Sequence, residues 1–296
     1  AVEDVGEEGG SGAQRTGRVV GLVRRCSKPI IGTVDGGSVD PSKPAQHVTV
    51  IPMDRRFPRL RLRTRQASNL VNQRVVVVVD EWLAEKSHPQ GHLVRVLCAA
   101  GDRATETEAI LLQHDVAHEP FVPQVLACLP SPDWTPTPED YAARWDLRDV
   151  CICSVDPPGC TDIDDALHAK PLANGNFEVG VHIADVTHFV REGTHLDLEA
   201  AARATTVYLV DRRIDMLPAL LGTNLCSLRG GVERLAFSVV WELTADAKVV
   251  SAKFGKSVIR SSASLTYDQA QTMLDDSKAE SDVARSLHVL NRLAKV

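Results

Sequence analysis

Six prolines lie between Pro120 and Pro138, and they separate two stretches of the chain that have different patterns. Proline fixes φ and has no backbone N–H, so we expect neither a helix nor a strand to run through this segment. The 296 residues are also long enough for about two domains. The sequence therefore predicts two domains joined by a proline-rich connection, rather than one continuous sheet or bundle.

The stretch before the prolines has the pattern of an all-β domain. Short apolar runs are separated by Gly, Pro, Asn and Asp, as is typical of strands and turns. The runs are "GRVVGLVRR", "PIIGTV", "HVTVIPM", "RLRLRT", "RVVVVVDEW", "HLVRVLCAA" and "TEAILLQHD". About five such strands in this length fit a small Greek-key barrel, of which the OB fold is the common example. We predict an OB barrel over residues 17–115, after an acidic, Gly-rich linker at residues 1–16.

The stretch after the prolines mixes helix and strand signals. "FEVGVHIADV" and "LAFSVVWEL" alternate apolar and polar residues, which predicts half-buried strands. A helix is expected from Thr137-Pro138, another at the start of "HLDLEAAARATTVYL", and a third at a capping box formed by Thr266 and Gln269. We predict a connection and helix at residues 116–147, and an α+β domain over residues 148–296. The missing initial Met and a final helix without a stop signal predict a piece of a longer protein.

The segment "CSVDPPGCTDIDDALH" places four aspartates around a Pro-Pro-Gly turn: Asp156, Asp162, Asp164 and Asp165. Like charges this close raise one another's pKa, so the arrangement is costly unless cations neutralise it. Mg²⁺ takes carboxylate oxygens and retains water for a substrate phosphate, as in two-metal nucleases. A solvated acidic turn explains the spacing equally well. An EF-hand does not fit, because Gly and Glu are missing from the sixth and twelfth positions of its loop.

A second candidate feature is the run "FPRLRLRTRQ", in which arginine recurs at every second residue. As a strand it presents four guanidinium groups on one face, from Arg59, Arg61, Arg63 and Arg65. Residues 55–74 hold seven Arg and no acid, although the formal net charge of the chain is −6. This basic stripe predicts contacts to nucleic-acid phosphates, and a charged solvent face of a barrel strand is the alternative.

A third candidate is the segment "TTVYLVDRRIDMLP". Tyr208 is suited to stacking on a base, and Arg212 and Arg213 to holding phosphates, although a lone Tyr is more often part of a core. The odd number of cysteines, seven, predicts reduced thiols and no disulfide-linked partner. Cys151, Cys153, Cys160 and His168 lack the spacing of a zinc site, and His182 and His188 are interpreted as structural. No window is apolar enough to span a membrane, so we expect no membrane partner.

Longer motifs resemble one known family. "DLRDVCICSVDPPGCTDIDDALH", "NGNFEVGVHIADVTHFV", "TTVYLVDRRIDMLPALLGTNLCSLRGGVERLAFSVVWEL" and "KSVIRSSASLTYDQAQ" resemble the catalytic RNB domain of the ribonuclease II/ribonuclease R family. "GRVVGLVRR", "RLRLRTRQAS" and "ETEAILLQHDV" resemble the cold-shock (OB) domain that precedes it in the eukaryotic, exosome-associated branch. The implied fold is an OB, cold-shock-type barrel followed by the N-terminal half of an α+β RNB domain, truncated at its C-terminal end.

The resemblance also implies a function. It implies a hydrolytic, processive 3′→5′ exoribonuclease that degrades single-stranded RNA to nucleoside 5′-monophosphates with Mg²⁺, for which Mn²⁺ is expected to substitute. Asp156, Asp162, Asp164 and Asp165 match the catalytic, metal-binding acids of the family, and Tyr208 matches an aromatic residue near the 3′-terminal nucleotides. Exosome core subunits are the implied partners. The expected location is the nucleus and nucleolus with a cytoplasmic pool.

Two other functions stay open at this stage. One is a catalytically inactive RNA-binding scaffold of the same fold, against which the four intact aspartates speak. The other is an OB module that binds RNA without catalysis, which leaves residues 153–168 unexplained. Dependence on a metal separates the enzyme from both.

Overall fold

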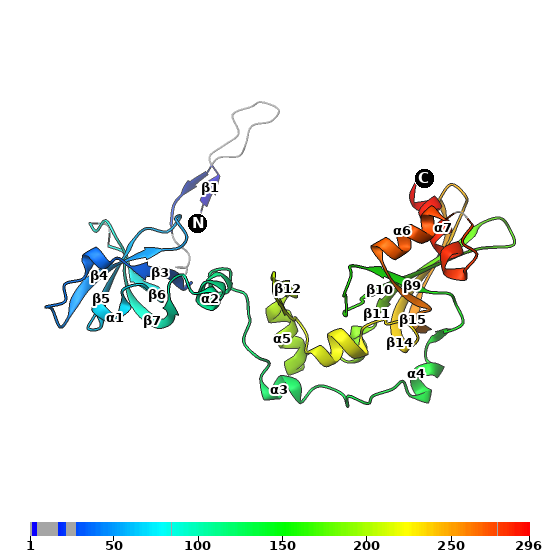
Figure 1. Ribbon diagram of the computed structural model, residues 1–296, viewed down its shortest axis with the longest axis horizontal. Helices are drawn as coiled ribbons and strands as arrows, with labels where there is room; N and C mark the ends of the chain where they lie inside the picture. Colours follow the sequence, from blue (N-terminus) through cyan, green and yellow to red (C-terminus); the bar gives the residue numbers. More distant parts are fainter. Residues whose placement is uncertain (1, 5–16, 22–27, 84, 277) are drawn as a thin grey trace, which may run out of the picture. The chain divides into compact units, whose positions relative to one another are not determined.

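The chain forms two compact units, Ala1–His118 and Glu119–Val296, in a computed structural model that describes residues 2–4, 17–21, 28–83, 85–276 and 278–296 (Figure 1). Within the stretch expected as a linker, β1 (Val2–Asp4) pairs antiparallel with β2 (Gly17–Val19). The rest of that stretch, and residues 22–25 of the expected strand "GRVVGLVRR", lie outside the described residues.

The first unit contains a closed five-stranded barrel with the strand order β3-β4-β5-β7-β6. Its strands are β3 (Ile30–Val34), β4 (Gln46–Pro52), β5 (Leu60–Thr64), β6 (Gln73–Glu81) and β7 (Gln90–Ala99). Short helical turns, η1 (Gly36–Ser38) and α1 (Ala67–Leu70), connect them. The predicted OB-type barrel is confirmed.

Alternation along β4 and β5 builds the barrel core. Val48, Val50, Leu60 and Leu62 are at most 1% exposed and pack together inside the barrel. Burying one such side chain stabilises the fold by about 1.5–3 kcal/mol. Because successive side chains of a strand point to opposite faces, the arginines between these leucines face outward.

One sequence prediction for this unit is wrong. "TEAILLQHD" was expected as a strand, but it lies mostly in helix α2 (Arg103–Gln113). The Asp102 side chain caps that helix by accepting a hydrogen bond from Thr105 N. Ala109 then packs against Ile31 and Val76 of the barrel. A short apolar run does not distinguish a strand from a helix, and here the cap and the packing decide for the helix.

The second unit is built on a seven-stranded mixed sheet in the order β16-β9-β10-β11-β14-β15-β8, which confirms the α+β prediction. The pairs β15–β8 and β16–β9 are parallel and the others antiparallel. The strands are β8 (Trp145–Leu147), β9 (Cys153–Asp156), β10 (Asp165–Pro171), β11 (Phe177–Ala184), β14 (Glu233–Leu243), β15 (Val249–Arg260) and β16 (Ala263–Thr266).

Helices and one small hairpin surround the sheet, and the predicted helix starts at Thr137 and Thr266 are confirmed as capping boxes. The elements are α3 (Pro123–Leu126), α4 (Pro138–Ala142), η2 (Val186–His188), α5 (His195–Arg203), β12 (Val207–Tyr208), β13 (Arg213–Ile214), the π-helix η3 (Leu220–Leu225), α6 (Tyr267–Asp275) and α7 (Asp282–Ala294). No helix among the described residues is long and apolar enough to cross a membrane.

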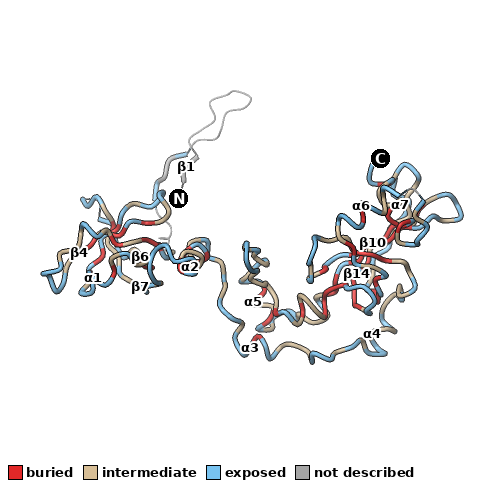
Figure 2. Tube along the Cα trace, viewed as in Figure 1, coloured by how far each residue is buried: buried red, intermediate tan, exposed pale blue. Residues whose placement is uncertain are grey.

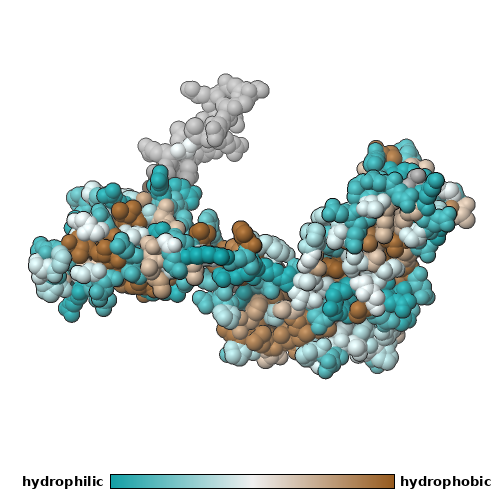
Figure 3. All heavy atoms as spheres, viewed as in Figure 1, coloured by the Kyte–Doolittle hydropathy of each residue, from teal (hydrophilic) through white to brown (hydrophobic). Residues whose placement is uncertain are grey.

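Both faces of the sheet are covered, and the buried segments follow its central strands (Figure 2). One face packs Phe177 and Val179 against Leu293 of α7. The opposite face packs Ala184 and Ala236 with residues such as Leu196 of α5. β11 therefore buries residues on both of its faces and does not follow the predicted half-buried alternation. His182 is fully buried, whereas Ile183, which was predicted to face the core, is exposed. Some apolar surface remains uncovered over α3, where Val122 and Leu126 are exposed (Figure 3).

A chain of hydrogen bonds runs through the centre of the sheet. His168 Nδ1 lies 2.8 Å from His182 Nε2, and His182 Nδ1 lies 2.7 Å from Ser238 Oγ. Ser238 Oγ continues to Ser257 Oγ at 2.6 Å. The His168 ring occupies the space that a Cβ at position 180 would need, so Gly180 is required there. His182 is structural, as predicted.

This histidine pair predicts an acid-sensitive fold. Burial lowers the pKa of both imidazoles, that of His182 to about 3, whereas an unfolded chain protonates histidine near 6.5. Between those values the unfolded state binds protons that the folded state does not. The free energy of unfolding should therefore fall as the pH drops below about 6.5, by up to about 1.4 kcal/mol per pH unit from His182, with a contribution of the same sign from His168. Hydrogen exchange of the β10 and β11 amides at two pH values measures this. The dependence should be weaker in His182→Gln, and an equal dependence in that variant would contradict the assignment.

Candidate active site

The four aspartates of the acidic segment gather where two neighbouring strands meet the same loop. Asp156 is the last residue of β9 and Asp165 the first residue of β10. These strands pair antiparallel, so the connection between them, residues 157–164, lies at one end of the two strands. Asp162 and Asp164 belong to this connection, which we call the acidic loop.

The acidic loop is fixed by a turn and by a buried anchor. Cys160 N donates to Pro157 O at 3.1 Å across a turn in which Gly159 has a φ of 80°, a conformation that favours glycine. Ile163 is buried, and its N–H donates to Ser227 Oγ at 3.2 Å. Ser227 Oγ in turn donates to Thr161 O at 2.8 Å. The loop is thereby held in place independently of its carboxylates.

Asp162 is the one member of the cluster whose two oxygens are both engaged by the β12–β13 hairpin. The Tyr208 hydroxyl donates to Oδ2 at 2.8 Å, and Arg213 Nη1 donates to Oδ1 at 2.6 Å. Burial raises the pKa of Asp162, but the hydrogen bond from Tyr208 and the charge of Arg213 outweigh it, and the pKa is lowered. The same bond raises the pKa of Tyr208 to about 12. Asp162 is therefore ionised at neutral pH.

Asp164 and Asp156 lie in less favourable surroundings for a carboxylate than Asp162. The pKa of Asp164 is raised, first by partial burial and then by the charges of Asp162, Asp165 and Asp156. The charges of the other three aspartates therefore all act on Asp164. Asp156 Oδ2 is buried and has no hydrogen-bond partner. A buried carboxylate oxygen without a partner is unfavourable, so a cation or a hydrogen-bond donor at this position would complete the cluster.

The donor set fits a hard divalent cation. Four carboxylates and nearby backbone carbonyls supply only oxygen, which is the ligand type of Mg²⁺ and Mn²⁺. Among the described residues, however, no group of three or more His, Cys, Asp or Glu side chains is already arranged to hold a metal ion. The partnerless Asp156 oxygen and the repulsion by neighbouring carboxylates at Asp164 fit a cation bound at this cluster.

The basic stripe lies on the barrel of the first unit. Arg59, Arg61, Arg63 and Arg65 are all exposed, and Leu60 and Leu62 between them are buried. A hollow of about 420 Å³ opens beside the stripe. His47 of β4 and Arg61 of β5 line it together with Glu85, Lys86 and His88 of the β6–β7 loop. Basic side chains therefore gather on this surface of the barrel beside one acid.

The residues of the third candidate segment separate into two environments. Tyr208 is 68% exposed although its hydroxyl is fixed on Asp162, and Arg212 is exposed. Arg213 is engaged by carboxylates on two sides, Asp162 and Asp215, so its guanidinium is not free for a phosphate in this arrangement. The contacts of Tyr208 and Arg213 with Asp162 were not predictable from the sequence, because no periodicity connects Asp162 with residues some 50 positions later. Roles in RNA binding stay predictions for all of these residues.

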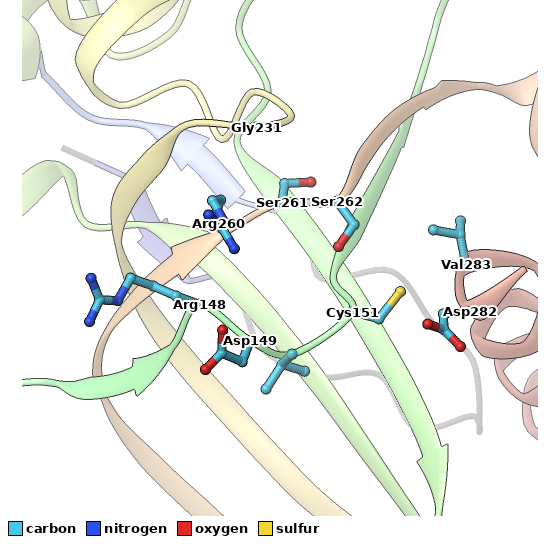
Figure 4. A pocket seen from close by; sticks show the side chains of 10 residues that line it. Arg148, Asp149, Cys151, Gly231, Arg260, Ser261, Ser262, Asp282 and Val283 are labelled. Carbon is cyan, nitrogen blue, oxygen red and sulfur yellow. The ribbon is translucent and has the colours of Figure 1, made fainter.

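A hollow of about 590 Å³ in the second unit lies away from the four aspartates of the acidic cluster (Figure 4). Arg148 and Arg260 line one side, and Cys151 and Asp282 the other. Arg148 is already held by Asp146 and Glu233, at 2.7 and 3.2 Å. The hollow therefore offers less free positive charge than its composition suggests.

Comparisons with known proteins agree with this geometry. The family model of the RNB domain matches residues 144–296, and that of the Dis3-like cold-shock domain 2 matches residues 47–115. The exosome complex exonuclease RRP44 of Mus musculus is 52% identical over 281 residues, which is 95% of this chain and 29% of that protein. The exosome complex exonuclease dis3 of Schizosaccharomyces pombe is 50% identical over 292 residues, 96% of this chain and 30% of that protein. The chain thus spans about three tenths of the length of these relatives.

Solved structures show the same fold at lower identity. Mycoplasma genitalium RNase R in complex with double-stranded RNA superposes with a TM-score of 0.77 and 22% identity, over 94% of this chain and 48% of that one. Yeast Ssd1, described as a pseudonuclease, superposes with a TM-score of 0.76 and 24% identity, over 96% of this chain and 35% of that one. An enzyme and a pseudonuclease share this fold, so the side chains of the site have to decide the function.

Proposed function

The chain belongs to the RNB-domain family, in its Dis3-like branch with a preceding cold-shock domain, and from that premise we propose that it is the middle part of a processive, hydrolytic 3′→5′ exoribonuclease. The observation that carries the proposal is the convergence of four aspartates at the ends of β9 and β10, with one buried carboxylate oxygen left without a partner. A scaffold without catalysis has no use for that unsatisfied oxygen.

The acidic cluster is proposed to hold Mg²⁺, with Mn²⁺ as a substitute. Asp156, Asp162, Asp164 and Asp165 would be its ligands. When bound, the ion lowers the pKa of a water molecule and neutralises charge on the scissile phosphate. Asp156 and Asp165 stand at rigid strand ends, and Asp164 is held through its backbone, whose carbonyl accepts from Ala184 N at 2.9 Å. This backbone placement limits how far each carboxylate moves.

We propose that RNA binds without sequence specificity. The exposed Tyr208 offers a face on which any base stacks, and stacking carries no sequence code. The arginines of the basic stripe would hold phosphates, with the hollow beside Arg61 receiving one nucleotide. The products expected of this arrangement are nucleoside 5′-monophosphates.

The basic stripe gives a prediction on salt dependence. Replacing Arg61 and Arg63 by Ala should weaken single-stranded RNA binding and reduce the slope of log affinity against log salt by about 1.4, since each phosphate neutralised on a single strand contributes about 0.7. Fluorescence anisotropy at several salt concentrations measures the slope. Arg56→Ala is the matched control, because Asp54 already binds that guanidinium at 2.7 Å. An unchanged slope in the double variant would leave the stripe a solvated face of the barrel.

The experiment that tests the proposed function follows the direction of cleavage in the full chain. Single-stranded RNA labelled at its 5′ end should shorten stepwise from the 3′ end, while a circular RNA of the same sequence stays intact. Chromatography should identify the released product as nucleoside 5′-monophosphate. Binding of both RNAs without cleavage of either would instead support the inactive scaffold.

Partners and location are part of the proposal. The relatives are described as subunits of the exosome complex, and we extend this to the present chain as an expected association with exosome core subunits. A nuclear and nucleolar location with a cytoplasmic pool remains a prediction, which imaging of the tagged full chain tests.

A further inference from the structure

We propose that the contact between Arg213 and Asp162 docks the β12–β13 hairpin onto the acidic loop, which makes Arg213 a positioning residue for both Asp162 and Tyr208. The inference rests on the proposed function, because it concerns the placement of one group assigned there to the metal and one assigned to RNA. It goes further by giving Asp162 a second role, the anchoring of the hairpin.

The first observation is the geometry of the contact. Tyr208 and Arg213 are directly opposite each other in the register of the hairpin. One cross-strand pair therefore supplies both donors to Asp162, at 2.8 Å to Oδ2 and 2.6 Å to Oδ1. Two donors on two oxygens fix the rotation of the carboxylate as well as its position. The Asp162 and Arg213 side chains are only 18% and 24% exposed, so solvent screens the pair weakly.

The second observation is the small size of the hairpin. It consists of two residue pairs, and a two-stranded hairpin is at best marginally stable by itself. Its tip residue Val210 is fully exposed. At its base, Arg203 Nη1 of α5 donates to Asp215 O at 3.2 Å, which anchors the opposite end. The end of the hairpin that carries Tyr208 contacts the acidic loop through the hydrogen bonds of Tyr208 and Arg213 to Asp162.

The third observation is that Arg213 is itself aligned. Its Nε forms an ion pair with Asp215 Oδ1 at 2.7 Å, while its Nη1 donates a hydrogen bond to Asp162 Oδ1. A guanidinium makes both contacts at once because its donors form a rigid fork, whereas a lysine ammonium is a point charge on a flexible stem. Arg213→Lys should therefore retain the charge and only part of the positioning.

The consequence is a coupling between the acidic cluster and the RNA-facing side chain. The Tyr208 hydroxyl is fixed on Asp162 although the residue is 68% exposed, so its ring stands at the edge of the cluster and open to solvent. A base stacked on that ring is thereby placed at a set distance from the carboxylates. Loss of Asp162 or Arg213 should release the ring even when no metal is present.

Hydrogen exchange of the full chain without RNA or metal tests the docking. In Arg213→Gln, peptides covering residues 206–216 should exchange at least about tenfold faster than in the wild type, because a charge-assisted bond of this burial is lost. Arg213→Lys should lie between the two. Arg212→Gln removes the same charge from the neighbouring exposed position and should leave the exchange unchanged. Wild-type exchange in Arg213→Gln, or equal loosening by Arg212→Gln, would overturn the proposal.

RNA affinity in EDTA gives a second readout with a matched pair of acids. Asp162→Ala should weaken binding of an RNA 3′ end by about tenfold, since stacking on a positioned aromatic side chain contributes on this order. Asp149→Ala removes an exposed carboxylate of the same unit that lines the hollow away from the acidic loop, and it should leave that affinity intact. Equal losses in both variants would overturn the coupling. If the wild type cleaves no RNA while Arg213→Gln loosens the hairpin, the proposed function fails and the docking stands; the reverse result rejects the docking alone.

Discussion

Asp164→Asn should abolish RNA cleavage by the full chain, lowering the single-turnover rate by about 10³-fold or more, while the affinity for single-stranded RNA stays within about twofold. Asparagine keeps the shape of the side chain but removes the charge, and electrostatic stabilisation of this kind contributes several kcal/mol to such reactions. The backbone carbonyl of residue 164 still accepts from Ala184 N, so the loop should keep its fold.

The measurement is a single-turnover time course beside a binding titration of the same RNA. Asp215→Asn is an informative companion, because Asp215 is an acid of the same unit that touches Arg213 rather than the cluster. That variant should retain cleavage at a reduced rate. Parallel loss of affinity and cleavage in Asp164→Asn would mean that Asp164 binds RNA or holds the fold, and not that it serves the chemical step.

Asp185→Ala should destabilise the second unit by about 3–5 kcal/mol. The Asp185 and Arg144 side chains are 2% and 4% exposed, and Arg144 Nη2 lies 2.6 Å from Asp185 Oδ2. Thr187 Oγ1 donates to the other carboxylate oxygen at 2.7 Å, and Lys256 Nζ approaches at 3.2 Å. Removing the aspartate leaves the arginine charged, buried and unpaired, which is more costly than losing the bond itself.

The double variant Asp185→Ala with Arg144→Met separates these causes. Without the orphaned charge it should regain a substantial part of the lost stability, because replacing both members of a buried pair is far less harmful than removing one. Native-state hydrogen exchange of the β11 and β14 amides measures the free energy of opening in each variant. A double variant as unstable as the sum of the single ones would show that the two residues act independently.

The barrel was predictable because short apolar runs alternate with turn residues, and because β4 and β5 alternate buried and outward-facing positions. Leu60 and Leu62 face inward and the arginines outward, and that period of two is visible in the sequence. The same reasoning failed for α2, where the run Ala109–Leu112 is apolar on consecutive positions and the decision comes from the Asp102 cap and the barrel surface. Whether a short apolar run forms a strand or a helix depends on the surface against which it packs.

The candidate site was predictable in its composition and not in its connections. Four aspartates around a turn are compatible with a cation site or a solvated acidic turn, and the structure adds that Asp156 ends β9 and Asp165 begins the neighbouring β10. The link from Asp162 to Tyr208 and Arg213 depends on where the hairpin folds back, which no local pattern encodes. The pairing of His168 with His182 is of the same kind, since it follows from the register of β10 on β11.

The most direct test of the central claim is the metal dependence of cleavage at the aspartate cluster. The rate of shortening of 5′-labelled single-stranded RNA would be measured for the full chain in EDTA and across a Mg²⁺ titration, with Asp164→Asn beside the wild type. We expect no cleavage in EDTA, a saturable recovery with Mg²⁺ in the wild type, and no recovery in Asp164→Asn. Cleavage that persists in EDTA, or that responds to Mg²⁺ equally in both proteins, would contradict the assignment of the acidic cluster as the metal-dependent catalytic centre.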